Sequence, residues 1–298
     1  MSHMFRFPLL ASGLVVLVAA IGACSPLGIV NGLTPTNTYI ETANLEYGAD
    51  PRQQLDVYQP QRPADTRAPP DGYPVVVFFY GGSWTSGERR NYKFVGEALA
   101  SHGIVAIVAD YRVYPQVRYP DFLTDCARAV AWAQREAPRY DGDVRRLYVM
   151  GHSSGAYNAA MLALDARWLT SAGLAPSALA GWIGLAGPYD FLPMTNKKAQ
   201  PVFNHPDYPA GSQPIDYASK AAPRTFLGAA ATDATVNPER NTKQLAEKLR
   251  AADVPVTLRI YPKPNHLTLI GAFARPLRRL APVLEDVVAF VQDERAAR

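Results

Sequence analysis

The sequence has few cysteines and no cluster of metal-binding side chains. Only two of its 298 residues are cysteine, which is too few for a framework of disulfide bonds. Cys126 lies among apolar residues that recur at helical spacing, so we expect an inert, buried thiol. No group of His, Asp and Glu has the spacing of metal ligands, and no glycine-rich phosphate loop with its lysine is present. The sequence therefore predicts no metal site and no phosphate-binding loop.

Runs of charged residues are also short. The formal net charge is +4, and the densest basic runs are "GERR" at 87–90 and "LRR" at 277–279. Such scattered charge indicates a solvated surface rather than a nucleic-acid-binding patch. There is no internal repeat and no low-complexity tract, and the length allows one large domain or two small ones. We expect no nucleic-acid partner.

The N-terminus carries one long apolar stretch, from Phe7 to about Ile21. It follows a single arginine and is short for a membrane span, so residues 1–23 are predicted to be a secretory signal peptide. The end of this stretch, "IGAC" at 21–24, resembles the lipobox of bacterial lipoproteins, although Gly22 stands where alanine or serine is commoner. The resemblance implies that Cys24 is acylated and becomes the mature N-terminus. A plain signal peptide or a signal anchor remains the alternative.

Residues 24–36 are then expected to form a flexible tether that leads into a single domain over 37–298. Together with the signal peptide, this predicts a protein of the bacterial cell envelope, either attached to a membrane through lipid at Cys24 or released into the periplasm or the medium. The sequence indicates no oligomeric state.

Apolar runs alternate with helical segments from residue 55 onward. Runs rich in β-branched and aromatic residues predict strands at 55–60, 74–80, 103–111, 145–151, 181–187, 224–230 and 256–261. Apolar residues at helical spacing predict helices near 91–102, 121–136, 154–164, 239–251 and 279–294. This alternation predicts an α/β fold with a mostly parallel central sheet and helices on both faces.

The segment 191–222 interrupts the alternation. It contains many prolines and glycines, no clear period, and aromatic residues at Phe191, Phe203, Tyr208 and Tyr217. An irregular segment of this length inside a compact domain usually has a function. We expect a lid or a pocket wall.

The motif "GHSSG" at 151–155 lies directly between an apolar strand and an alanine-rich helix. This is the context of a nucleophile elbow, a sharp strand-to-helix turn with a strained serine and closely packed glycines on either side. Ser153 is the central residue and the predicted nucleophile. For Ser154 to take that place, glycines would be needed at His152 and Ala156. The backbone N–H of Ser154 instead begins the helix, where it can face a developing oxyanion.

A second motif, "YGGSW" at 80–84, follows the predicted strand 74–80. Paired glycines let the backbone turn its N–H groups toward a bound carbonyl, so Gly82 and Ser83 are predicted to complete an oxyanion hole with Ser154. Here the chain resembles the α/β-hydrolase family, specifically its hormone-sensitive-lipase-like and feruloyl-esterase-like branch, which carries His-Gly-Gly at this position, often followed by Trp, as Trp84 follows here. Tyr80 replaces that histidine, and we expect it to support the loop.

The resemblance covers about 50–295, nearly the whole predicted mature chain. The segments "ADYRVYP" at 109–115, "YPDFLTDCARAVAWA" at 119–133 and "GPYDF" at 187–191 all look like this branch and occur in its order. The resemblance implies an α/β-hydrolase fold. Asp110 and Arg112 are expected to brace loops rather than to act in catalysis.

A serine nucleophile needs a histidine base and a carboxylate that orients the base, in the chain order Ser, acid, His for this fold. Two histidines follow Ser153, namely His205 and His266. His266 is favoured because it follows strand 256–261, where the family places its base, whereas His205 lies in the irregular segment. The acid is expected to be Asp233, whose Asp-x-x-Val pattern matches the family, with Asp190 as the second candidate. His152 is expected to be a packing or pocket residue.

These residues predict a serine hydrolase that acts on small-molecule carboxylic esters and needs no cofactor. The resemblance leaves one alternative reaction open, cleavage of amides or formamides, because relatives resembling arylformamidases share the Gly-Gly-x-Trp segment. A non-catalytic, envelope-anchored binding protein on the same fold is the second alternative, since a fold alone does not determine function.

Overall fold

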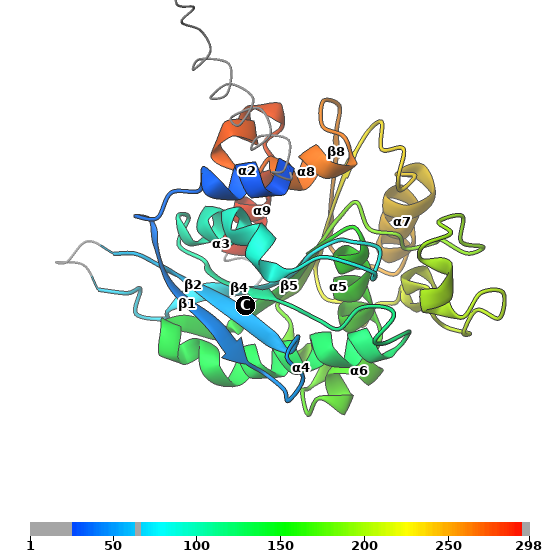
Figure 1. Cartoon of the computed structure of the whole chain (residues 1–298), viewed down its shortest axis with the longest axis horizontal. Helices are drawn as coiled ribbons and strands as arrows, with labels where there is room; N and C mark the ends of the chain where they lie inside the picture. Colours follow the sequence, from blue (N-terminus) through cyan, green and yellow to red (C-terminus); the bar gives the residue numbers. More distant parts are fainter. Residues whose placement is uncertain (1–25, 63–66, 294–298) are drawn as a thin grey trace, which may run out of the picture.

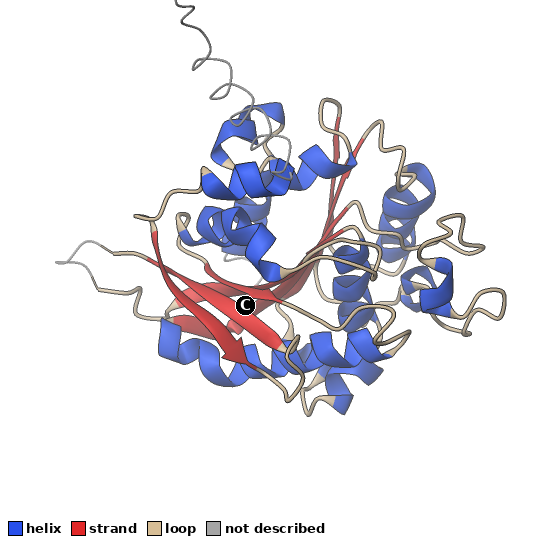
Figure 2. Cartoon of the chain, viewed as in Figure 1, coloured by secondary structure: helices blue, strands red, loops and turns tan. Residues whose placement is uncertain are grey.

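The computed structural model describes residues 26–62 and 67–293, which form one central sheet between layers of helices (Figures 1 and 2). The predicted signal peptide and Cys24 lie outside these residues. The eight strands are arranged in the order β1-β2-β4-β3-β5-β6-β7-β8. Their bounds are β1 (Tyr39–Glu46), β2 (Gln54–Pro60), β3 (Tyr73–Phe79), β4 (Val105–Ala109), β5 (Gly142–His152), β6 (Gly181–Leu185), β7 (Thr225–Ala230) and β8 (Val256–Tyr261). Strands β3 to β8 are parallel to one another, and β2 runs antiparallel to both of its neighbours, β1 and β4. The predicted α/β fold is confirmed.

Strand β1 is absent from the sequence-based prediction. Within the described sheet β1 lies at the edge, next to β2. Most of its side chains are partly or fully exposed, so it lacks the continuous apolar run of the inner strands. An edge strand of this kind carries little hydrophobic signal. The inner strands differ: β4, β6 and β7 are buried along their whole length, as expected for strands covered on both faces.

Helices cover the two faces of the sheet in separate groups. Helices α3 (Lys93–Ala100) and α9 (Val283–Gln292) lie on one face, and α4 (Asp121–Glu136), α5 (Ser154–Leu164) and α6 (Ala166–Ser171) lie on the other (Figures 1 and 2). The predicted helix 239–251 is a π-helical turn, η6 (Glu239–Lys243), continued by α7 (Gln244–Ala251). Helix α9 begins at Val283 rather than near 279, because Pro282 precedes it and the chain before it forms a 3₁₀ helix, η7 (Arg275–Leu280).

The predicted tether contains a further helix, α2 (Pro26–Gly32). Its Asn31 side chain accepts a hydrogen bond from the backbone N–H of Phe94, 3.3 Å away, and donates one to the carbonyl of Arg90. Val30 packs against the hydrophobic core. These contacts dock the helix onto the domain, which corrects the expectation of a flexible tether for residues 26–32.

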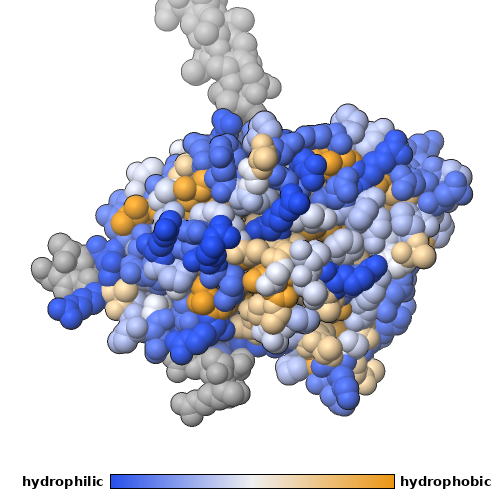
Figure 3. Space-filling view, turned by 90° about the horizontal axis from the view of Figure 1, so that it is seen from below, coloured by the Kyte–Doolittle hydropathy of each residue, from blue (hydrophilic) through white to orange (hydrophobic). Residues whose placement is uncertain are grey.

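On the face shown in Figure 3, most of the surface is hydrophilic and hydrophobic residues are interspersed. Among the described residues, four large hydrophobic side chains are exposed: Ile29, Leu33, Ile40 and Leu267. Arg89 of the basic run at 87–90 is buried between Asp56 and Asp110. Within the described part of the chain, no helix is long and apolar enough to cross a membrane.

Candidate active site

Ser153 occupies the turn between β5 and α5, with φ 55° and ψ −124°. This left-handed backbone is unusual for a non-glycine residue. A Cβ atom on Gly151 would lie 2.1 Å from the carbonyl oxygen of Gly155, and one on Gly155 would lie 2.0 Å from that of Phe79. Any side chain at Gly151 or Gly155 would therefore clash with the backbone. The turn has the geometry expected of a nucleophile elbow.

The three predicted triad residues lie together at the carboxyl edge of the sheet. The Nε2 atom of His266 is 2.9 Å from Oγ of Ser153, and its Nδ1 atom is 2.7 Å from Oδ2 of Asp233. Asp233 follows β7 and His266 follows β8, and parallel strands end at the same edge. The arrangement can take a proton from Ser153 and stabilise the resulting imidazolium with a carboxylate.

The Asp233 side chain is fully buried. Burial alone would raise its pKa, but the hydrogen bond from His266 and those from the backbone N–H groups of Val236 and Thr235 together lower the pKa of Asp233 below its usual value. The carboxylate is therefore ionised at neutral pH, as an orienting acid must be.

The other candidates for acid and base lie in different contacts. The Asp190 carboxylate accepts two hydrogen bonds from the Arg240 guanidinium, at 3.0 and 3.1 Å. The exposed His205 contacts the hydroxyl of Tyr208 through its Nδ1 atom, at 3.0 Å. Neither Asp190 nor His205 therefore takes part in the hydrogen-bonded chain that begins at Ser153.

Two side chains lie beside His266: Asn265, which the sequence analysis does not single out, and His152, which it predicts to be a packing or pocket residue. Asn265 caps helix α8 (His266–Gly271), and its side chain accepts hydrogen bonds from the backbone N–H groups of Leu267 and Thr268. A helix of six residues shows no period in the sequence, which is why α8 was not predicted. His152 lies beside the base, with its Nε2 2.9 Å from the carbonyl oxygen of His266.

His152 is a buried neutral residue rather than a base. Burial and the neighbouring His266 lower the pKa of His152 to about 3. A carbonyl oxygen only accepts, so Nε2 of His152 carries the proton and donates it to the His266 backbone. The ring centroids of the two histidines are 4.9 Å apart. His152 thus packs against the candidate base, in line with the predicted packing role.

Residues 81–87, called the oxyanion loop from here on, include the predicted donors Gly82 and Ser83. The loop lies next to the nucleophile because β3 pairs with β5 and Phe79 is opposite Gly151. A Cβ atom on Gly81 would lie 2.9 Å from Cβ of Ser153. Gly82, Ser83 and Trp84 all have positive φ, at 141°, 54° and 57°. Within the described residues, the N–H groups of Gly82 and Ser83 donate to no protein acceptor. Ser154, at the start of α5, supplies a third free N–H.

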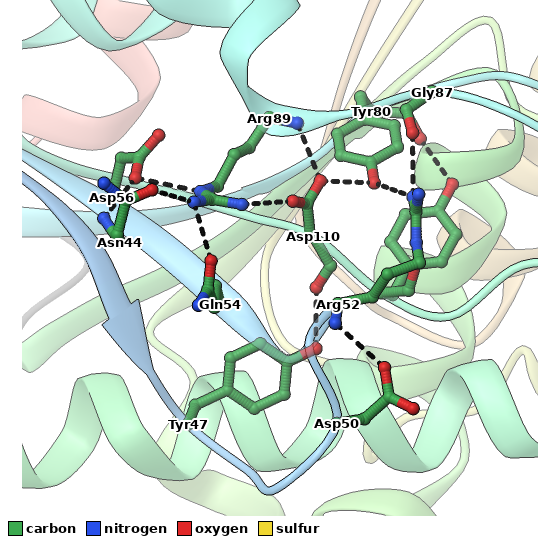
Figure 4. Close-up of polar contacts among 11 residues, drawn as sticks. Asn44, Tyr47, Asp50, Arg52, Gln54, Asp56, Tyr80, Gly87, Arg89 and Asp110 are labelled. Carbon is green, nitrogen blue, oxygen red and sulfur yellow. Dashed lines mark hydrogen bonds and ion pairs between the residues drawn. The ribbon is translucent and has the colours of Figure 1, made fainter.

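Side chains within and next to this loop attach it to the rest of the domain. The indole Nε1 of Trp84 donates to Oδ1 of Asn158 on α5, at 3.0 Å. The hydroxyl of Tyr80 donates to Oδ1 of Asp110, at 2.6 Å (Figure 4). Asn158 was missed in the sequence, although it is a conspicuous polar residue in an alanine-rich helix.

The irregular segment 191–222 forms a wall beside the oxyanion loop. Its regular parts are two 3₁₀ turns, η4 (Gln200–Phe203) and η5 (Pro214–Tyr217). The ring of Phe203 is fully buried, 4.9 Å from the Trp84 ring and 5.1 Å from that of Phe191 between centroids. The exposed Asn196 donates from Nδ2 to Oγ of Ser83, 3.2 Å away. The wall is therefore aromatic beneath and polar at its rim.

The residues expected to brace neighbouring loops lie in buried ion pairs. The Nε and Nη2 atoms of Arg112 both donate to the Asp125 carboxylate, at 2.8 Å, and Gln53 donates to the same carboxylate at 2.7 Å. The adjacent Cys126 is fully buried, and burial raises the pKa of its thiol. This is the inert environment predicted for it.

Fold and site together define the class of protein. A mostly parallel α/β sheet with an elbow after a central strand, followed by an acid and a histidine in that order, is the architecture of the α/β-hydrolases. The Ser–His–Asp contacts are those of a serine hydrolase. The chain belongs to the BD-FAE family, whose family model matches residues 55–249. The predicted resemblance to the branch of hormone-sensitive-lipase-like and feruloyl-esterase-like proteins is thereby confirmed at the level of the family.

The relatives of this chain include esterases. The chain is 27% identical over 235 residues to the esterase LipC of Mycobacterium tuberculosis, covering 72% of this chain and 56% of LipC. It is 32% identical over 148 residues to a probable isoprenylcysteine α-carbonyl methylesterase of Oryza sativa subsp. japonica, covering 48% of this chain and 34% of that protein. The chain thus spans about half or less of the length of these relatives.

Among solved structures, a truncated carbohydrate esterase from gut microbiota superposes with a TM-score of 0.70, covering 89% of this chain and 99% of that chain. The sequence identity is 17%, so this likeness shows the fold alone.

Proposed function

We propose that this protein is a serine carboxylesterase that hydrolyses short-chain or aryl carboxylic esters through an acyl-enzyme intermediate. The observation that carries the proposal is the contact chain from Ser153 through His266 to Asp233, at 2.9 and 2.7 Å. Membership of the BD-FAE family and the esterase names of its relatives support it.

In the proposed reaction, Ser153 attacks the ester carbonyl while His266 takes its proton. Asp233 holds the Nδ1–H tautomer of His266 and stabilises the imidazolium. The N–H groups of Gly82, Ser83 and Ser154 bind the oxyanion of the tetrahedral intermediate. His266 then gives its proton to the leaving alcohol. A water molecule, deprotonated by the same histidine, releases the acid and restores Ser153.

The direct test is turnover of p-nitrophenyl acetate together with labelling of Ser153 by a fluorophosphonate. We expect both. Labelling with turnover of N-formylkynurenine exceeding that of the ester would favour a formamidase instead. Neither labelling nor turnover would favour a non-catalytic binding protein.

The enzyme should prefer esters with short acyl chains. Each methylene that fits an apolar pocket contributes roughly 0.8 kcal/mol, so kcat/KM rises with chain length only until the pocket is full. Here the wall is closed by packed aromatic rings, with Phe203 fully buried against Trp84, and Asn196 makes the rim polar. Such a wall suits a compact pocket better than a long acyl groove.

We therefore expect kcat/KM to peak between acetyl and about hexanoyl esters, a range taken from the behaviour of the fold class, and to fall beyond it. The measurement is a p-nitrophenyl ester series from acetate to palmitate. Rates that still climb at palmitate, with activation at an oil–water interface, would show that 191–222 acts as a lipase lid.

The proposed location is the bacterial cell envelope, with an acyl anchor at Cys24. Full-length protein expressed in a bacterium should fractionate with membranes and carry an acylated N-terminus at that residue, and Cys24→Ser should block the processing. Two acyl chains anchor stably where one is marginal. Because α2 begins at Pro26 and is docked through Asn31, the anchor would hold the domain close to the bilayer. Intact-mass data showing cleavage elsewhere without lipid would refute the anchor.

A further inference from the structure

Arg52 connects three separate segments around the oxyanion loop. Its Nη2 atom donates both to the hydroxyl of Tyr80, at 2.9 Å, and to the carbonyl oxygen of Gly87, at 2.7 Å. Its Nε atom donates to the carbonyl oxygen of Tyr111, at 3.1 Å. Tyr80 precedes the oxyanion loop and Gly87 ends it. One guanidinium group therefore joins both ends of the loop to the segment that follows β4 (Figure 4).

The loop needs such restraint because its backbone is strained. Gly82, Ser83 and Trp84 have positive φ in succession, and a non-glycine residue in this region persists only where its surroundings over-determine it. Inside the loop, the N–H groups of Thr85 and Ser86 donate to the carbonyl of Gly82, at 3.0 and 3.2 Å. These local bonds shape the turn but do not fix it relative to Ser153.

Asp110 ties the same two ends from the other side. Its Oδ1 atom accepts hydrogen bonds from the Tyr80 hydroxyl, at 2.6 Å, and from the backbone N–H of Arg89, at 2.7 Å. The Arg89 side chain is also held, by the carboxylates of Asp110 and Asp56. The hydroxyl of Tyr80 thus bridges Asp110 and Arg52, accepting from the arginine and donating to the carboxylate.

Arg52 is itself held in place by the turn between β1 and β2. Its backbone N–H donates to Oδ1 of Asp50, at 2.8 Å, and the N–H of Gln53 donates to the carbonyl of Asp50, also at 2.8 Å. The side chain is partly buried. A planar guanidinium can serve several acceptors in fixed directions, whereas a lysine ammonium is a compact point charge on a flexible stem. The three acceptors around Arg52 therefore suit a guanidinium group better than an ammonium group.

We infer that Arg52 is a positioning residue for the oxyanion hole: by holding Tyr80 and Gly87 it fixes the direction of the Gly82 and Ser83 N–H groups toward the transition state. The inference rests on the proposed esterase function. Arg52 touches neither Ser153 nor His266 in the structure, so its effect passes through the loop.

The test compares Arg52→Met and Arg52→Lys with a matched control, Arg146→Met. Arg146 also donates to a backbone carbonyl, that of Gly72 at 2.6 Å, and to a carboxylate, that of Asp143 at 2.9 Å, but it lies on β5 toward the opposite edge of the sheet. Loss of one oxyanion donor costs roughly 100- to 1,000-fold in kcat. Since misdirected donors remain present, we expect Arg52→Met to lower kcat on p-nitrophenyl acetate by about 10- to 100-fold, with KM little changed.

Four further readouts separate a positioning role of Arg52 from a contribution to general stability. The kcat of Arg52→Lys should stay well below that of wild type, and added guanidinium ion should partly restore kcat to Arg52→Ala while leaving the kcat of Arg146→Ala unchanged. The rate of fluorophosphonate labelling, which also places an oxygen in the oxyanion hole, should fall in parallel with kcat. Arg146→Met should lower the melting temperature and leave kcat near that of wild type.

The inference is overturned if Arg52→Met keeps wild-type kcat, if only KM rises, or if guanidinium ion restores no kcat to Arg52→Ala. If Arg52→Met does not fold, the decision rests on Tyr80→Phe, which removes only the bridging oxygen and should lower kcat without changing KM; unchanged kcat there overturns the inference. A wild type without turnover or labelling would overturn the proposed function, and this inference with it. Turnover in the wild type with unaffected Arg52 variants would overturn this inference alone.

Discussion

Replacing Ser153 by alanine is expected to reduce ester turnover by roughly several thousand-fold or more, with the fold intact. The variant loses the atom that forms the acyl-enzyme, so only the oxyanion hole and substrate binding remain to accelerate attack by water. The Oγ atom is 2.9 Å from Nε2 of His266, and no other hydroxyl of residues 26–62 and 67–293 makes a hydrogen bond to that nitrogen. The measurement is kcat/KM on p-nitrophenyl acetate, with circular dichroism and thermal melting as checks of folding.

Ser154→Ala is the matched control for this change. The proposed role of Ser154 uses only its backbone N–H, which alanine keeps, and the residue sits at the first position of α5. We expect turnover within a few-fold of wild type, about the size of an ordinary side-chain effect. A severe loss in Ser154→Ala with tolerance of Ser153→Ala would show that the elbow has been assigned to the wrong serine.

Sequence reasoning succeeded where a local pattern carries a steric meaning. The glycines of "GHSSG" are needed because a Cβ atom at Gly151 or Gly155 would lie within 2.1 Å of a backbone oxygen. The sequence reveals this constraint directly, because only glycine lacks a Cβ atom. The inner strands were predictable for a similar reason: burial on both faces demands an uninterrupted apolar run. The Ser–acid–His order then narrowed the candidate base and acid to a few residues.

The supports of the site were not predictable in the same way. Arg52 precedes β2 in a polar stretch, and only tertiary packing brings it to Tyr80 and Gly87. Asn158 and Asn265 are single polar residues whose partners lie in another element or in a helix too short to show a period. Helix α2 was likewise missed, because its docking depends on the Asn31 contacts with residues 90 and 94. Long-range hydrogen bonds leave no periodic trace in a sequence.

Substitution of Asp233, the acid of the triad, is expected to have the second largest effect on turnover. Asp233→Asn is expected to keep the fold and to lower kcat on the order of a thousand-fold or more. The carboxylate has two distinct oxygens in the structure: Oδ1 accepts from the backbone N–H groups of Thr235 and Val236, at 2.8 and 2.9 Å, and Oδ2 faces Nδ1 of His266 at 2.7 Å.

An asparagine at this place has one oxygen and one NH₂ group. The two backbone donors require the oxygen on their side, so the NH₂ group must face His266. Nδ1 of His266 then has to accept, its proton moves to Nε2, and Nε2 points a hydrogen at Ser153 instead of a lone pair. The base is lost through its tautomer while the packing is nearly unchanged.

Asp190→Asn is the comparison that decides between the two candidate acids. Asp190 accepts hydrogen bonds from Arg240, a residue whose side chain is 43% exposed, and a partly exposed ion pair contributes only about 0–1 kcal/mol to stability. We expect kcat for Asp190→Asn close to that of wild type and a small loss of melting temperature. The two variants should be measured as purified, folded proteins on the same ester. A large fall in kcat for Asp190→Asn beside a mild one for Asp233→Asn would transfer the role of the acid to Asp190. Such a result would require His266 to turn away from the contact that it makes in the structure.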